Sequence, residues 1–228
     1  MIQTWIGDIT PLLNERIYRK YYDSLPKWRK EKADKLKNLK KAQSAGVWIV
    51  YQKMQEAYGF AEDAVYNLSH SGKYAMCAVD VGNEGAREAE RRLKEDGCTG
   101  IHEEGAAAKL GCDVEMIKNI RPGVAKRFFC PAEEAYIMGQ ETEERRAEEF
   151  YRYWVLKESF IKATREGLKL DLRSFEIRIE KGGPVLIRRP EEYPEIYYYR
   201  EFELEAGDAR CAVCSTNPVF SEIRSIEL

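Results

Sequence analysis

The sequence contains no long hydrophobic run. No stretch of about eighteen apolar residues occurs in its 228 residues, so no transmembrane helix is predicted. Residues 1–6 lack a basic region followed by a long apolar stretch, and we expect no signal peptide. These absences argue against a membrane-spanning protein and predict that no membrane is among its partners.

Histidine and paired cysteine are also scarce. The chain has two histidines, and its six cysteines are scattered at positions 77, 98, 112, 130, 211 and 214. This spacing fits neither a disulfide framework nor a four-cysteine metal site, since Cys211 and Cys214 have no second pair nearby. We therefore predict a reduced, cytoplasmic protein.

Charge is balanced overall but not locally. The net charge is −2, with 33% charged and 44% hydrophobic residues, as in ordinary globular proteins. Residues 27–41 hold eight basic side chains against only Glu31 and Asp34. Such a patch attracts anions, although a solvated helix face is the plainer interpretation of the charge alone.

The pattern of apolar residues predicts a mixed α+β fold. Strands are expected at residues 2–9, 64–68, 74–79, 109–116, 174–179, 184–188, 196–204 and 209–215. Helices are expected at residues 12–22, 26–41, 45–58, 83–96 and 142–165, with another beginning at Pro131. Because the order is roughly repeated, we predict two similar subdomains, residues 1–108 and 109–228, related by pseudo-twofold symmetry. Each is expected to be a small antiparallel sheet packed with helices.

Three short segments carry the candidate chemistry. The first is Asn67-Leu68-Ser69-His70-Ser71-Gly72, in which residues 69–72 are interpreted as a polar turn between two strands. Backbone N–H groups, serine hydroxyls and a histidine suit a phosphate group. A plain hairpin turn is the alternative.

The second segment, Gly111-Cys112-Asp113-Val114-Glu115, places two carboxylates two residues apart in a predicted strand. They therefore project from one face, while Cys112 and Val114 face the core. Like charges this close need a cation between them, and Mg²⁺ prefers oxygen ligands. A solvated strand face with two acids is the alternative.

The third segment is a predicted helix in which Trp154, Glu158 and Lys162 lie four residues apart and share a face. Glu158 is then a candidate for a third metal carboxylate, and Lys162 lies one turn away, able to neutralise phosphate charge. A Glu–Lys surface pair is the alternative. The apolar residues around the pair indicate a buried helix, and buried charges need partners, which favours the functional interpretation.

Together these segments resemble the 4'-phosphopantetheinyl transferase superfamily, in its larger, pseudo-dimeric, surfactin-synthetase-activating form. The matching pieces occur in order as Asn67-Leu68-Ser69-His70-Ser71, Gly111-Cys112-Asp113-Val114-Glu115, Arg127-Phe128-Phe129 with Glu133, and Trp154-x-x-Lys157-Glu158-Ser159-x-x-Lys162-Ala163 before Gly167-Leu168. The resemblance covers roughly residues 24–215. It implies a monomer whose two halves form a pseudo-dimer.

The resemblance implies a role for each candidate residue. Asp113, Glu115 and Glu158 are expected to hold Mg²⁺ on the diphosphate of coenzyme A. His70 is expected near the 3'-phosphate of the adenosine, and Lys162 beside the α-phosphate. The full set expected to bind coenzyme A is Arg29, Lys32, Lys41, Ser69, His70, Lys157 and Lys162.

The implied reaction moves 4'-phosphopantetheine from coenzyme A to a serine of an apo acyl or peptidyl carrier protein, releasing adenosine 3',5'-bisphosphate. The carrier would serve fatty acid, polyketide or nonribosomal peptide synthesis. Glu158 and Lys162 are the catalytic candidates, and the base is Glu158 or a metal-bound water near Glu115.

Two alternatives to the enzyme remain. One is a family member that binds coenzyme A or a carrier without transfer; the other is an unrelated protein whose basic helix binds nucleic acid. All three acids and Lys162 are present, and the aromatic interleaving of single-strand binders is not. We therefore expect an enzyme and no nucleic-acid partner.

The sequence departs from the family pattern in three places. The Gly-Lys-Pro that members often carry is missing before residue 65, and residues 80–108 make a longer link than usual. We expect this link to be a disordered loop. The glycine usual after Lys-Ala is replaced by Thr164 or Arg165, so the end of that helix is expected to differ.

Overall fold

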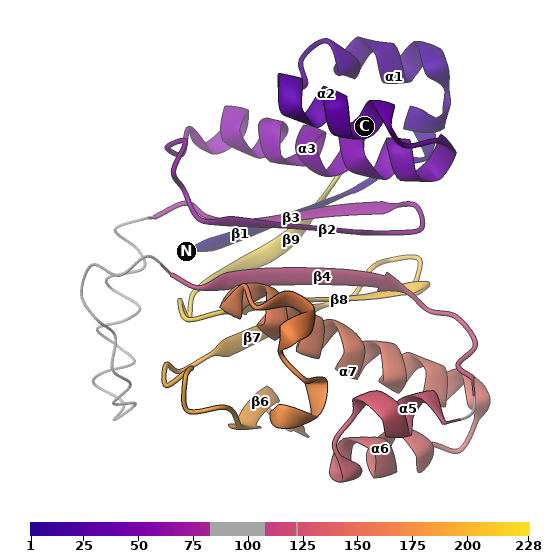
Figure 1. The fold of residues 1–228 in the computed structure, drawn as a ribbon, viewed down its shortest axis with the longest axis vertical. Coiled ribbons are helices and arrows are strands. Elements are labelled where there is room, and N and C mark those ends of the chain that lie inside the picture. The colour runs from indigo at the N-terminus through magenta and orange to yellow at the C-terminus, as the bar shows by residue number, and fades with distance from the viewer. Residues whose placement is uncertain (83–107, 122) are drawn as a thin grey trace.

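Two sheets lie at the centre of the molecule, and helices cover the outer side of each (Figure 1). The computed structural model describes residues 1–82, 108–121 and 123–228. The predicted helix at 83–96 and most of the long link at 80–108 therefore lie outside the described residues. The mixed α+β class predicted from the sequence is confirmed.

The first half begins with a strand and then builds a helical layer. Its elements are β1 (Ile2–Asp8), the 3₁₀ helix η1 (Thr10–Leu13), α1 (Glu15–Tyr22), α2 (Lys27–Asp34), α3 (Asn38–Tyr58), β2 (Tyr66–Ser71) and β3 (Tyr74–Asp80). The long helix α3 packs its apolar face on β3 and β1, and it ends at Gly59, which adopts a left-handed conformation with φ 61°.

The second half has the longest helix and the remaining strands. Its elements are β4 (Leu110–Met116), α5 (Val124–Phe128), α6 (Pro131–Met138), α7 (Glu143–Thr164), the 3₁₀ helices η2 (Gly167–Lys169) and η3 (Leu172–Ser174), β5 (Glu176–Glu180), β6 (Gly183–Arg188), β7 (Tyr198–Phe202), β8 (Ala209–Ser215) and β9 (Phe220–Ile226). Helix α7 packs on the three-stranded sheet β4-β8-β7, whose pairs are antiparallel, and β5 and β6 form a separate hairpin.

The last strand returns to the first half, which corrects two predictions. Strand β9 was not predicted; it pairs in parallel with β1 and completes the sheet β2-β3-β1-β9. Residues 220–226, assigned from the sequence to the second subdomain, therefore belong to the first sheet, which is not purely antiparallel. This pairing covers an edge of β1 that would otherwise leave backbone groups without partners.

The basic segment also differs from its prediction. The expected single helix at 26–41 is broken after Asp34, and α3 begins at Asn38. Lys35 and Lys37 lie in the link, while Lys40 and Lys41 lie in the first turn of α3. The basic side chains consequently do not share one helix face.

An apolar cluster joins the two halves. Met76 of β3, Val114 of β4 and Val213 of β8 are fully buried, and they pack together between the two sheets. Tyr74 adds a polar tie, because its hydroxyl donates to Asp208, which also pairs with Lys73. The halves therefore share a core, and their facing edges are held in a defined position.

No described helix combines the length and the apolar character that crossing a bilayer requires.

Helix α7 ends on a strained residue, which generates a first prediction. Arg165 is exposed and has φ 62°, a left-handed conformation that costs a non-glycine residue about 1–2 kcal/mol. Arg165→Gly should raise the free energy of unfolding by about 0.5–1 kcal/mol after allowing for the greater flexibility of glycine in the unfolded chain. Urea unfolding measures the gain, and Arg165→Ala is the control. Equal stabilities of the two variants would contradict this account.

Candidate active site

A cavity of about 300 Å³ opens where β2, β4 and α7 meet. Six of the eight residues around it were predicted as site residues from the sequence, and Leu68 and Trp154 complete the lining. The structure thus brings together residues far apart in the chain: Ser69, His70, Asp113, Glu115, Glu158 and Lys162.

Strand β4 positions the two carboxylates that lie two residues apart. Cys112 and Val114 are fully buried in the core between the sheets, so Asp113 and Glu115 project from the opposite face. Gly111 sets the distance to α7, because a Cβ at this position would lie 2.1 Å from the carbonyl oxygen of Ser159. Only glycine permits this approach, which brings the acids of β4 beside the functional face of α7.

The Lys162 ammonium group lies at the centre of the site. It donates to Asp113 Oδ1 at 2.7 Å, to Ser69 Oγ at 3.0 Å and to the Cys112 carbonyl oxygen at 3.0 Å. These three bonds use all three of its donors. Burial is the largest single influence and would lower the pKa of Lys162, but the charge and hydrogen bond of Asp113, together with smaller contributions from Cys112 and Glu158, outweigh it and the pKa is raised. The side chain is therefore held as a cation.

The acids outnumber this one cation. Burial and the charge of Asp113 raise the pKa of Glu158, and burial raises the pKa of Glu115 although Ser71 donates to its Oε2. Asp113 Oδ2 is buried and has no hydrogen-bond partner among the described residues. A buried oxygen without a partner costs free energy, so the site is short of positive charge.

A divalent cation fits this shortage, but its site is not preassembled. Among residues 1–82, 108–121 and 123–228, no group of three or more His, Cys, Asp or Glu side chains is close enough together to hold a metal ion. The available donors are nevertheless oxygen atoms of carboxylates, which are the ligands that Mg²⁺ prefers. The unpartnered oxygen of Asp113 is the strongest indication that a cation is accommodated here.

Strand β2 differs from its prediction. Ser69, His70 and Ser71 lie within the strand, and the turn follows at Gly72, whose φ is 52°. The Ser69 hydroxyl donates to Asp113 and accepts from Lys162 and from the Val114 N–H. One donor and two acceptor sites are all that a hydroxyl offers, so Ser69 has no hydrogen bond left for a phosphate, contrary to the prediction.

His70 stays accessible at the mouth of the cavity. Although the side chain is exposed, its partial desolvation by the cavity walls and the nearby charge of Lys162 lower its pKa, with a smaller contribution from Lys32, so the imidazole is neutral at neutral pH. Lys32 is exposed and close enough to act on His70 electrostatically. These two residues are therefore available for an anion, and their contact with a phosphate stays a prediction.

Large parts of the chain are similar to known proteins. Residues 109–214 match the model of the 4'-phosphopantetheinyl transferase superfamily. 4'-Phosphopantetheinyl transferase Sfp of Bacillus subtilis (strain 168) is 32% identical over 160 residues, which cover 70% of this chain and 58% of Sfp. Over these residues the chain is similar to the 4'-phosphopantetheinyl transferase superfamily. The alignment with Sfp spans less than two thirds of that relative's length.

Other relatives of this superfamily are similar over less of the chain or at lower identity. 4'-Phosphopantetheinyl transferase psf-1 of Bacillus pumilus is 30% identical and covers 69% of this chain and 55% of its own length. A holo-(acyl-carrier-protein) synthase of Bacillus anthracis, solved with coenzyme A (3',5'-ADP), aligns with 49% of this chain and 96% of its own at 19% identity. Its TM-score is 0.40, too low to support any structural argument.

Two more residues expected to bind coenzyme A, Lys41 and Arg29, lie against aromatic rings. The Lys41 ammonium group lies 4.3 Å from the ring centroid of Tyr18 and 4.0 Å from Glu15, so it is held against α1. Arg29 is buried against Trp28 and Trp48, with its guanidinium carbon 4.5 Å and 5.2 Å from their ring centroids. Its Nε has no partner, and none of the described carboxylates pairs with it.

Lys157 was also expected to face a phosphate, and the structure contradicts this prediction. Its side chain is fully buried on another face of α7, with its Nζ 2.9 Å from Glu133 and within 2.8 Å of the carbonyl oxygens of Leu172 and Phe175. Glu133 in turn accepts from the backbone N–H groups of Cys130 and Ile177. The pair joins α6, α7 and the start of β5, which is a structural role.

This assignment predicts the effect of Lys157→Met. The substitution leaves the Glu133 carboxylate buried without its cation and should lower the free energy of unfolding by about 3–5 kcal/mol. Coenzyme A affinity of the folded protein should stay unchanged. Urea unfolding and calorimetric titration measure the two quantities, with the exposed Lys169→Met as control. A stable variant with weakened coenzyme A binding would restore the phosphate role.

Asn67 and Ser71 belong to the first predicted segment, but the sequence analysis included neither in the expected set of ligands and did not predict their contact with β4. Both lie on the face of β2 that turns toward β4, and both accept a backbone N–H from it. The alternation of polar residues at 67, 69 and 71 would have revealed them if the segment had been read as a strand.

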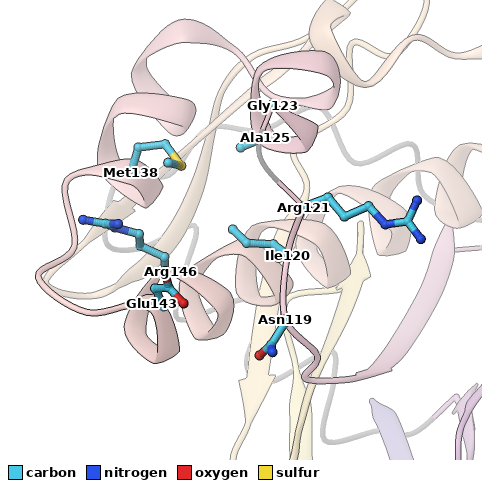
Figure 2. A pocket seen from close by; sticks show the side chains of 8 residues that line it. All are labelled: Asn119, Ile120, Arg121, Gly123, Ala125, Met138, Glu143 and Arg146. Atoms are coloured by element: carbon cyan, nitrogen blue, oxygen red, sulfur yellow. The ribbon is translucent and has the colours of Figure 1, made fainter.

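A second cavity, of about 250 Å³, lies away from the carboxylates of this site. It is formed by the segment after β4, α5, the end of α6 and the start of α7. Figure 2 shows Ile120, Ala125 and Met138 around a common space, while Arg121 extends the other way. None of its residues was predicted as a site residue.

Proposed function

We propose that this chain transfers the 4'-phosphopantetheine arm of coenzyme A to a serine hydroxyl of an apo carrier protein, with adenosine 3',5'-bisphosphate as the leaving product. One observation carries the proposal: three carboxylates, Lys162 and His70 line a single cavity, and one buried oxygen of Asp113 has no partner. The relatives bear the name of this transferase. A cytoplasmic monomer stays our prediction.

The metal in this proposal is Mg²⁺, held by Asp113, Glu115 and Glu158. When bound, it would neutralise charge on the diphosphate and on the departing phosphate. Among the described residues, no group of three or more metal-binding side chains is already assembled, and this agrees with the usual coordination of Mg²⁺. Mg²⁺ usually binds through one or two carboxylates together with waters and substrate phosphates, so the substrate would complete the site.

Lys162 would stabilise the charge that develops on the leaving phosphate. In the absence of substrate its ammonium group is held by Asp113, Ser69 and the carbonyl of Cys112. A diphosphate oxygen can replace one of these acceptors without moving the side chain out of the site. Such a positioned charge acts most strongly when negative charge is greatest, which is in the transition state.

Glu158 is the better candidate for the base that removes the serine proton. It lines the cavity and accepts no hydrogen bond from the described residues, whereas Glu115 accepts one from Ser71. Its pKa is raised by burial and by Asp113, which brings its basicity closer to that needed near neutral pH. The proton would pass from the serine hydroxyl to Glu158 as the hydroxyl oxygen attacks the β-phosphate.

The nucleotide end of coenzyme A would lie against β2 and α2. His70 is accessible and neutral, and Lys32 is exposed beside it, so a 3'-phosphate would find a cation and a donor there. Arg29 is a buried cation without a carboxylate partner in the described part of the chain, and it lies one helical turn from Lys32. Adding a phosphate here would raise the pKa of His70.

The transfer is tested by weighing a carrier protein. Incubation with coenzyme A, Mg²⁺ and an apo carrier should increase the carrier mass by one phosphopantetheine, and a carrier whose serine is replaced by alanine should gain nothing. Asp113→Asn should slow transfer at least about 100-fold, because it removes charge from the metal site while keeping the shape. Coenzyme A binding without any mass gain would favour the non-catalytic alternative.

A second prediction separates the role of Lys162 from simple binding. Lys162→Ala should lower kcat about 100-fold and change the affinity for coenzyme A much less, because its charge matters most in the transition state. Turnover kinetics and calorimetric titration supply the two numbers. Lys169→Ala, a substitution of an exposed lysine in η2, is the control. Unchanged kcat with weaker binding would contradict the role.

A further inference from the structure

Side chains of β2 replace a neighbouring strand along the free edge of β4. β4 lies at the edge of its sheet, so every second N–H of this strand has no backbone acceptor. Alternate side chains of β2 accept these N–H groups: Asn67 Oδ1 from Cys112 at 3.0 Å, Ser69 Oγ from Val114 at 3.3 Å and Ser71 Oγ from Met116 at 3.2 Å.

Two members of this ladder also hold the carboxylates. The Ser69 hydroxyl donates to Asp113 Oδ1 at 2.7 Å, and the Ser71 hydroxyl donates to Glu115 Oε2 at 2.5 Å. A serine has a single hydroxyl hydrogen, so each of these donors is committed to one carboxylate oxygen. The backbone bond fixes the serine oxygen, and the serine in turn fixes the acid.

We propose that Ser71 is a positioning residue of the transfer reaction, which holds one oxygen of Glu115 so that the other is presented to the cation. The inference rests on the proposed function. Ser71 is buried, it touches no other group of the cavity, and it does not line the cavity itself. It therefore acts through Glu115 and not on the substrate.

Asn67 provides a matched control within the same ladder. It accepts an N–H from β4 as Ser71 does, but it touches no carboxylate. Asn67→Ala and Ser71→Ala each remove one side-chain acceptor for a backbone N–H of β4. Only Ser71→Ala also removes a hydrogen bond to a carboxylate, that of Glu115. Ser69 cannot serve this purpose, because it also contacts Lys162.

The test measures metal binding directly and not through turnover. Mn²⁺ is titrated into the protein with saturating coenzyme A, and free Mn²⁺ is followed by electron paramagnetic resonance. Ser71→Ala should weaken Mn²⁺ binding at least about 10-fold, as is usual when a partner of a metal ligand is lost. Ser71→Thr, which keeps the hydroxyl, should restore the affinity. Asn67→Ala should stay within about twofold of the wild type, while urea unfolding of the same samples shows comparable losses for the two alanine variants.

Each outcome decides between separate claims. If Ser71→Ala binds Mn²⁺ as tightly as Asn67→Ala does, Ser71 only holds the strands together and the inference is overturned, while the proposed function stands. If threonine fails to restore affinity to a folded protein, the hydroxyl is not the group that matters and the inference is equally wrong. A wild-type protein that binds no Mn²⁺ in the presence of coenzyme A contradicts the proposed function, and the inference with it.

Discussion

An excess of negative charge in a partly buried cavity is the constraint around which the rest of this molecule is arranged. Asp113, Glu115 and Glu158 face one ammonium group, that of Lys162, and burial prevents water from screening them fully. Burial first, and the charge of Asp113 after it, raise the pKa values of Glu115 and Glu158, and the second oxygen of Asp113 has no hydrogen-bond partner among the described residues. A cation that binds together with its ligand would supply the positive charge that this cavity lacks.

Both halves of the molecule hold the charged side chains of the cavity in place. β4 and α7 supply the acids and the lysine, and Gly111 lets them approach because no side chain intervenes. β2 belongs to the other sheet, yet it supplies the hydroxyls that orient Asp113 and Glu115. The site therefore lies where the two sheets meet. The apolar cluster between the sheets and the returning strand β9 fix the position of the sheets relative to each other.

Local periodicity was sufficient to predict the parts of the site that lie within one element. The two-residue spacing of Asp113 and Glu115 and the four-residue spacing of Glu158 and Lys162 place each pair on one face, and the structure agrees. Features that depend on contacts between residues distant in the sequence could not be predicted from local patterns. Strand β9 carries alternating charged residues and pairs with the opposite end of the chain, so no local pattern indicated it. Ser69, His70 and Ser71 have turn-forming residue types, but pairing with β3 and contacts with β4 keep them extended. Lys157 was misplaced because its neighbour Glu158 faces the cavity while Lys157 turns toward Glu133.

A crystal structure of the protein with coenzyme A and Mn²⁺, with the metal located by anomalous scattering, tests the central claim most directly. We expect one metal peak about 2.1 Å from Asp113 Oδ2 and from a diphosphate oxygen, with Glu115 and Glu158 turned to it directly or through water. Lys162 should then contact the diphosphate. A nucleotide bound away from this cavity, or a metal that Asp113 does not touch, would contradict the account.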